Sequence, residues 1–175
     1  MSITNAEIKA RCTSPENIRQ ILRSKNARYI GTDTQIDTYF AVPSGRLKLR
    51  QGKIENALIY YNRSDQAASK ISEVELFKTA NAPGLLRVLE AALPKLIVVE
   101  KMREIYFIEN VKFHLDQVKG LGSFVEIEAI DQDGEIDVEE LHAQCAYYRE
   151  LLGIQDEALE RSSYSDMLID QSRTS

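Results

Sequence analysis

The sequence predicts an α+β protein in which eight antiparallel strands close into a β-barrel with flanking helices. Eight short segments alternate polar and apolar side chains with the period of two that a β-strand shows. Most of these segments are joined by connections short enough for antiparallel neighbours, and only a few segments between them have helical periodicity. Because exposed strand edges are costly, this many antiparallel strands commonly close on themselves, and we expect a barrel or tunnel.

The expected strands lie at residues 3–12, 37–42, 45–51, 56–63, 70–78, 98–108, 111–118 and 123–130. Pro43, Ser44 and Gly45 predict a tight turn between the second and third strands. A polar turn at residues 64–69 joins the fourth and fifth strands, and Gly120 and Gly122 indicate a turn before the last one. These connections favour hairpins.

Apolar side chains at helical spacing predict helices at about residues 15–26, 82–93 and 138–152. Ser14 is the expected N-cap of the first helix, with Pro15 at its first helical position. Asn81 can cap the second helix, which Pro94 ends, and Gly153 is a C-terminal stop for the third.

The composition indicates one globular, cytoplasmic domain spanning residues 1–175. This length suits one core, and no internal repeat or linker divides the chain. No apolar stretch approaches the ~20 residues of a membrane span, and no signal-peptide pattern is present. A net charge of -5 argues against general nucleic-acid binding, so we expect neither a nucleic acid nor a membrane as partner.

Basic side chains are concentrated on the polar faces of the expected strands. Arg46, Lys48 and Arg50 place three cations on one face within roughly 14 Å, where they repel one another unless an anion lies among them. The corresponding faces of other strands carry Lys9, Arg11, Arg63, Lys101 and Arg103. For any one strand, a polar face exposed to water is the alternative interpretation.

Carboxylates occupy the same set of faces, at Glu7, Glu73, Glu75, Asp116, Glu126 and Glu128. If all these faces point inward, the lumen holds eight cations beside six carboxylates. Arg and Lys side chains bind phosphoryl oxygens, and glutamates at alternate strand positions can coordinate Mg²⁺ or Mn²⁺. The pattern therefore predicts a site for a polyphosphate bridged by metal.

Residues 5–9 (NAEIK) resemble the N-terminal Glu-x-Glu-x-Lys motif of the CYTH family of triphosphate tunnel metalloenzymes. The resemblance continues in order through QIDTYF at 35–40, RLKLR at 46–50, YYNR at 60–63, KMR at 101–103, LD at 115–116, GLGSFVEIE at 120–128 and SYSD at 163–166. It is strongest to the class IV adenylate cyclase branch, which is related to the thiamine triphosphatases. The implied fold is the closed triphosphate tunnel.

The resemblance implies roles for individual side chains. Metal ligands would be Glu7, Glu126 and Glu128, with Asp116 as a fourth; phosphate ligands would be Lys9, Arg46, Lys48, Arg50, Arg63, Lys101 and Arg103, with Arg11 continuing the face of Lys9. Asn5 stands at the first acidic position of the motif, which weakens metal binding or changes the number of metals. Further candidates are Asn5 itself, Glu73, Glu75 and His114.

Three functions follow as hypotheses. One is a class IV adenylate cyclase-like enzyme that uses Mg²⁺ or Mn²⁺ to convert ATP to cyclic AMP and pyrophosphate. The second is a triphosphatase hydrolysing inorganic, thiamine or nucleoside triphosphate with the same apparatus. The third is a non-catalytic module that binds a nucleotide or polyphosphate, an alternative that Asn5 leaves open. A homodimer is compatible with this fold.

Overall fold

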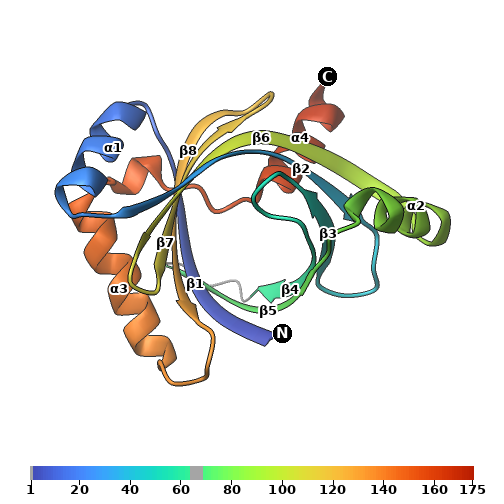
Figure 1. The fold of residues 1–175 in the computed structure, drawn as a ribbon. Coiled ribbons are helices and arrows are strands. Elements are labelled where there is room, and N and C mark those ends of the chain that lie inside the picture. Colours follow the sequence, from blue (N-terminus) through green and yellow to red (C-terminus); the bar gives the residue numbers. More distant parts are fainter. Residues whose placement is uncertain (1, 64–68) are drawn as a thin grey trace.

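The computed structural model describes residues 2–63 and 69–175 and confirms the closed, antiparallel barrel (Figure 1). The eight strands are β1 Ser2–Arg11, β2 Arg28–Phe40, β3 Arg46–Gln51, β4 Ala57–Arg63, β5 Lys70–Lys78, β6 Lys95–Ile108, β7 Val111–Val118 and β8 Gly122–Asp131. Around the barrel they follow the order β1-β5-β4-β3-β2-β6-β7-β8. Most of the polar turn predicted before β5 lies outside the described residues.

Two strands, β2 and β6, begin well before their predicted first residues. β2 begins at Arg28 rather than at residue 37, and β6 begins at Lys95 rather than at residue 98. In the first half of β2 the inward side chains Asp33 and Gln35 are polar yet fully buried, while the outward ones are exposed threonines and Ile36. Because polar residues occupy both faces, the alternation that marks a strand is lost there.

Two helices cover one side of the barrel, where the largest apolar core lies (Figure 1). They are α1 Pro15–Ser24 and α3 Val138–Leu151, both close to their predicted positions. Phe113 and Ile127 of the barrel wall pack with Leu22, Leu141 and Cys145 beneath these helices, all essentially inaccessible to water. Ser14 precedes α1 as predicted, but its side chain makes no capping hydrogen bond.

Two further helices lie elsewhere on the barrel. α2 Ala82–Ala92 packs on Phe40 and Leu49, and the predicted cap is confirmed because the Asn81 side chain accepts a hydrogen bond from the Gly84 N–H at 3.0 Å. α4 Tyr164–Thr174 was not predicted; its apolar residues pack against Val99 and Phe124. The single-turn helix η1 Asp156–Ala158 lies in the segment that connects α3 to α4.

Because the largest apolar core and the core beneath α2 lie between the outside of the barrel wall and the helices, much of the inward face of the strands is free to carry charge. The register then brings the polar residues together: Glu7 of β1 is opposite Glu128 of β8, and Lys9 is opposite Glu126. Arg50 of β3 is likewise opposite Asp37 of β2.

Within the described ranges, no helix is both long and apolar enough to cross a lipid bilayer.

Candidate active site

A cavity of about 490 Å³ fills the barrel and is lined by side chains from all eight strands. Among the described residues, eight lining side chains are cationic and five are acidic, an excess of three positive charges in a protein whose net charge is -5. The cations are Lys9, Lys48, Arg50, Arg63, Lys78, Lys101, Arg103 and Lys112; the acids are Glu7, Asp37, Glu55, Glu126 and Glu128. Such a local excess favours an anionic ligand.

Asp37 is the centre of the cationic side of the cavity. Its carboxylate accepts hydrogen bonds from Lys48 Nζ at 3.1 Å, Arg50 Nε at 2.9 Å and Lys101 Nζ at 2.8 Å. Burial alone would raise the pKa of Asp37, but the charges of Arg50, Lys101 and Lys48 outweigh it and hold that pKa well below its usual range. One carboxylate therefore orients three cations and compensates only part of their combined charge.

Lys101 has a strongly perturbed ammonium group. Burial lowers the pKa of Lys101 to about 7, with Arg50 and Arg103 acting in the same direction and Asp37 opposing them. Its charge is thus sensitive to what shares the cavity. An anion bound beside it would favour the protonated form.

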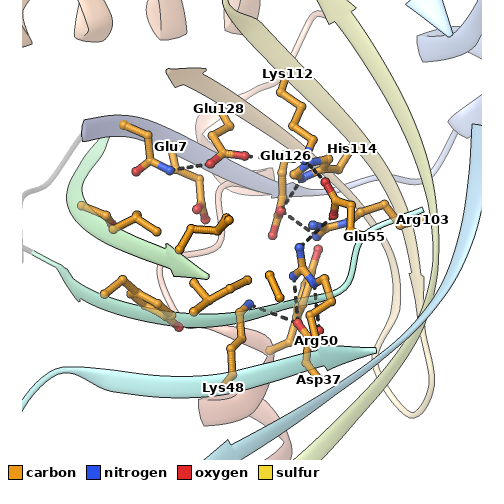
Figure 2. A pocket seen from close by; sticks show the side chains of 18 of the residues that line it. Glu7, Asp37, Lys48, Arg50, Glu55, Arg103, Lys112, His114, Glu126 and Glu128 are labelled. Carbon is orange, nitrogen blue, oxygen red and sulfur yellow. Dashed lines mark hydrogen bonds and ion pairs between the residues drawn. The ribbon is translucent and has the colours of Figure 1, made fainter. Parts of the chain in front are cut away.

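Glu126 is the centre of the acidic side. It accepts a hydrogen bond from Arg103 Nη2 at 2.9 Å, lies 2.9 Å from His114 Nδ1, and has Lys9 Nζ at 3.6 Å. Burial would raise the pKa of Glu126, but Arg103, His114 and Lys9 hold it well below its usual value. The carboxylate is therefore ionised, and its neighbours fix its orientation (Figure 2).

The imidazole of His114 is neutral and has one free nitrogen. Burial and the charge of Arg103 lower the pKa of His114, although the hydrogen bond with Glu126 acts in the opposite direction. Because Nδ1 faces the Glu126 carboxylate, we assign the proton to Nδ1. Nε2 is buried without a hydrogen-bond partner and lies 3.9 Å from Glu128 Oε2.

The donor set on β1 and β8 fits a hard divalent cation. Glu7, Glu126 and Glu128 offer carboxylate oxygens, the ligands that Mg²⁺ and Mn²⁺ prefer. Asn5 donates its amide N–H to Glu128, which leaves the buried Asn5 Oδ1 without a partner. Over the part of the chain that is described, no three His, Cys, Asp or Glu side chains are already gathered as metal ligands. Glu7 is instead paired with Arg63, since Arg63 Nη2 lies 3.2 Å from Glu7 Oε2.

Two predicted residues lie near the cavity but do not line it. Asp116 is buried behind Arg103, from which it accepts two hydrogen bonds of 2.7 and 2.6 Å, and the Tyr164 hydroxyl donates a third at 2.7 Å. With its oxygens occupied in this way, Asp116 positions Arg103. Arg46 lies at the barrel end and makes hydrogen bonds of 2.9 and 2.7 Å to Asp166 of α4.

The predicted inward placement of three residues was wrong. Glu73 and Glu75 are exposed on the outside of β5, because that strand turns Ser72, Val74 and Leu76 inward. Arg11 is also exposed: at the end of β1 it donates a hydrogen bond to the Leu121 carbonyl at 3.1 Å and stacks over the Phe124 ring. The other predicted residues, Asn5, Glu7, Lys9, Lys48, Arg50, Arg63, Lys101, Arg103, His114, Glu126 and Glu128, line the cavity.

One wall of the cavity is apolar. On β4 and β5, Ala57, Ile59, Tyr61, Val74 and Leu76 form a cluster whose side chains face the lumen. In the barrel order this wall lies between β1 and β3 and faces β6 and β7 across the lumen. The cavity is therefore amphipathic, with room for a group that does not carry charge.

Sequence reasoning missed four charged lining residues, Asp37, Glu55, Lys78 and Lys112. Lys78 lies on the inward face of β5 with Val74 and Leu76, the face that was expected to point outward. Asp37 shares a strand face with Tyr39, and Lys112 shares one with His114, so period-two counting from either neighbour finds them. Glu55 lies in the connection between β3 and β4, where no periodicity applies.

Comparisons with known proteins agree with this geometry. A family model for the CYTH domain matches residues 4–164. No curated protein matches the chain.

Among solved structures, PH1012 from Pyrococcus horikoshii is 26% identical, with a TM-score of 0.80 over 93% of this chain and 98% of that one. A candidate adenylate cyclase from Vibrio parahaemolyticus shares the fold at 17% identity, with a TM-score of 0.77 over 94% and 97% of the two chains. So does HpAC1 from Hippeastrum, a candidate adenylyl cyclase with a dominant triphosphatase activity, at 17% identity and a TM-score of 0.63 over 99% and 96%. With its lumen, its register and the match over residues 4–164, the chain belongs to the CYTH domain family.

Proposed function

We propose that the lumen binds a triphosphate together with a divalent metal ion and that the protein is a metal-dependent enzyme acting on that triphosphate. The observation that carries this proposal is the division of the lumen: Asp37 gathers three cations on one side, while Glu126, Glu128 and Glu7 lie on the other. A phosphate chain needs the cations, and the metal that accompanies it needs the carboxylates. Family membership supports the same assignment.

The cationic residues would bind the phosphoryl oxygens. Arg50 and Arg103 offer planar guanidinium groups, while Lys48 and Lys101 act as compact charges. Asp37 orients Lys48, Arg50 and Lys101, so little reorganisation of these side chains is required when an anion arrives. Such preorganisation is a main source of affinity and of transition-state stabilisation.

The acidic residues would hold Mg²⁺ or Mn²⁺. Glu7, Glu126 and Glu128 supply charge, and the unpartnered Oδ1 of Asn5 supplies a neutral oxygen. A bound ion neutralises phosphate charge and polarises the reacting phosphoryl group. His114 holds Glu126 in position through its Nδ1–H.

The apolar wall supports an organic triphosphate over inorganic triphosphate. Ile59, Val74 and Leu76 cannot bind phosphate, but they can pack against a base or another ring. With ATP, attack of the 3′-hydroxyl on the α-phosphorus forms cyclic AMP, releases pyrophosphate and frees the hydroxyl proton. This cyclase-like reaction is the function that we propose first.

Hydrolysis is the second candidate. The likeness in fold to HpAC1, a candidate cyclase with a dominant triphosphatase activity, favours it. Water would then attack the terminal phosphorus of nucleoside, thiamine or inorganic triphosphate, which releases orthophosphate and leaves the corresponding diphosphate. A module that binds without turnover is the third candidate, because Asn5 replaces one expected carboxylate and donates to Glu128.

The test is to incubate the purified protein with ATP, thiamine triphosphate or inorganic triphosphate, each with Mg²⁺ or Mn²⁺, and to measure cyclic AMP, pyrophosphate and orthophosphate. Cyclic AMP with equimolar pyrophosphate from ATP supports the cyclase, and orthophosphate without cyclic AMP supports the triphosphatase. No product from any substrate, with calorimetric binding retained, would reject the enzyme in favour of the binding module.

A further inference from the structure

Glu55 is a carboxylate placed inside a lumen that is otherwise suited to bind anions. It lies between β3 and β4, and its Oε2 accepts hydrogen bonds from Arg50 Nη1 at 3.0 Å and from Gln35 Nε2 at 2.9 Å. Its Oε1 is paired with Lys112 (Figure 2). Arg50 is on β3 and Lys112 on β7, and these strands are not neighbours in the barrel. Glu55 therefore bridges two cations from separate walls.

The Glu55 carboxylate is charged in this position. Burial would raise the pKa of Glu55, but the charges of Arg50 and Lys112 more than offset this effect and hold the pKa below its usual range. Its side chain is 24% exposed, so it lies where the cavity meets solvent. The ionised Glu55 carboxylate partly neutralises the charges of Arg50 and Lys112, so these two cations attract a ligand less strongly.

The position of Glu55 is fixed by its own loop. The buried Asp33 carboxylate accepts hydrogen bonds from the backbone N–H groups of Lys53 at 2.7 Å, Ile54 at 3.1 Å and Glu55 at 3.0 Å. A Cβ atom on Gly52 would collide with that carboxylate, so the close approach of the loop requires glycine there. The loop thus holds Glu55 in place instead of leaving it free to turn away.

We propose that Glu55 is a specificity-determining residue that limits the length of the phosphate chain in the lumen. This inference rests on the proposed function. A phosphoryl group added to a bound triphosphate at this end would have to take the place of the Glu55 carboxylate between Arg50 and Lys112. If the carboxylate stayed, it would repel the added group, since like charges at contact distance are strongly unfavourable in a partly buried site. Tetraphosphate should therefore bind less well than triphosphate.

The experiment measures calorimetric affinities for ATP and adenosine 5′-tetraphosphate, with Mg²⁺, in the full-length protein and two variants. Glu55→Gln keeps the shape and removes the charge. Glu139→Gln, at an exposed position in the first turn of α3, removes the same charge away from the lumen. We expect Glu55→Gln to raise the affinity for tetraphosphate relative to triphosphate by about tenfold or more, and Glu139→Gln to leave this ratio at the wild-type value.

Two negative results are distinguishable. If the wild-type protein binds triphosphate but the ratio is the same in Glu55→Gln as in Glu139→Gln, the role of Glu55 is wrong and the proposed function stands. If the wild-type protein binds no triphosphate, the proposed function fails and the inference fails with it. Circular dichroism and thermal unfolding verify that each variant folds. If Glu55→Gln does not fold, Glu55→Ala is measured instead. An unchanged ratio of tetraphosphate to triphosphate affinity in Glu55→Ala would overturn the inference in the same way.

Discussion

Replacing Asp37 by asparagine should destabilise the ligand-free protein while making it more responsive to an anion. Asp37 is almost wholly buried, and it is the carboxylate to which Lys48, Arg50 and Lys101 all donate. Removing one partner from a buried ion pair costs about 3–5 kcal/mol, because the remaining charge is left uncompensated. For a protein of this size 1 kcal/mol shifts Tm by about 2–4 °C, so we expect Asp37→Asn to lower Tm by at least about 6 °C.

The assay is thermal unfolding monitored by circular dichroism, with and without triphosphate. Asp166→Asn is the matched control, since it also removes a carboxylate from an arginine partner, but its side chain is 38% exposed and such pairs contribute only about 0–1 kcal/mol. Triphosphate should raise the Tm of Asp37→Asn by more than that of the wild type, because the ligand replaces the missing negative charge. Equal Tm values for the two variants, or an equal ligand response in Asp37→Asn and wild type, would refute this description of the cationic side.

Three further predictions concern protonation, metal dependence and positioning. Burial lowers the pKa of Lys101 to about 7, below its unfolded value of about 10.4. Between these pH values the unfolded chain binds one more proton than the folded chain, so the contribution of Lys101 to stability should rise with pH. Triphosphate binding at pH 8 should take up protons, which calorimetry detects as a binding enthalpy that depends on the buffer. Glu126→Gln should reduce Mg²⁺-dependent turnover at least about 100-fold, as expected when a charge-positioning group is lost, whereas Glu73→Gln on the outer face should leave it within twofold or so, and equal losses in a steady-state assay would refute this distinction. Asp116→Asn should raise the KM for triphosphate and lower the Tm, because Arg103 loses the carboxylate that orients it. Steady-state kinetics and thermal unfolding measure the two quantities, and unchanged values of both would exclude the positioning role.

The parts of the fold that were predictable are those in which one side of an element is apolar and the other is polar. β1, β7 and β8 pack on α1 and α3 with their apolar faces and turn the charged faces inward, so period-two counting placed Lys9, His114 and Glu126 in the lumen. The same counting failed in β5, where the apolar Val74 and Leu76 line the lumen and the glutamates face water. A period of two identifies two faces but not which of them points inward.

Other features depended on contacts between segments distant in sequence. Asp33 looks like a loop residue in the sequence, yet it is fully buried because it anchors the backbone of residues 53–55. Glu55 enters the lumen only through that anchor. The family resemblance implied that Asp116 is a metal ligand, but the register places it opposite Arg103, which occupies both of its oxygens.

The most direct test of a triphosphate site in the lumen is a calorimetric titration of ATP into wild-type protein and Arg50→Ala, with and without Mg²⁺. Arg50 contacts both Asp37 and Glu55 and is 9% exposed at its side chain, so it cannot act on a ligand bound outside the barrel. A charged hydrogen-bonding group contributes about 1.5–3 kcal/mol, and we therefore expect Arg50→Ala to weaken Mg²⁺-dependent ATP binding by about 10- to 100-fold. ATP binding of equal strength in both proteins, or binding that is indifferent to Mg²⁺, would contradict the site.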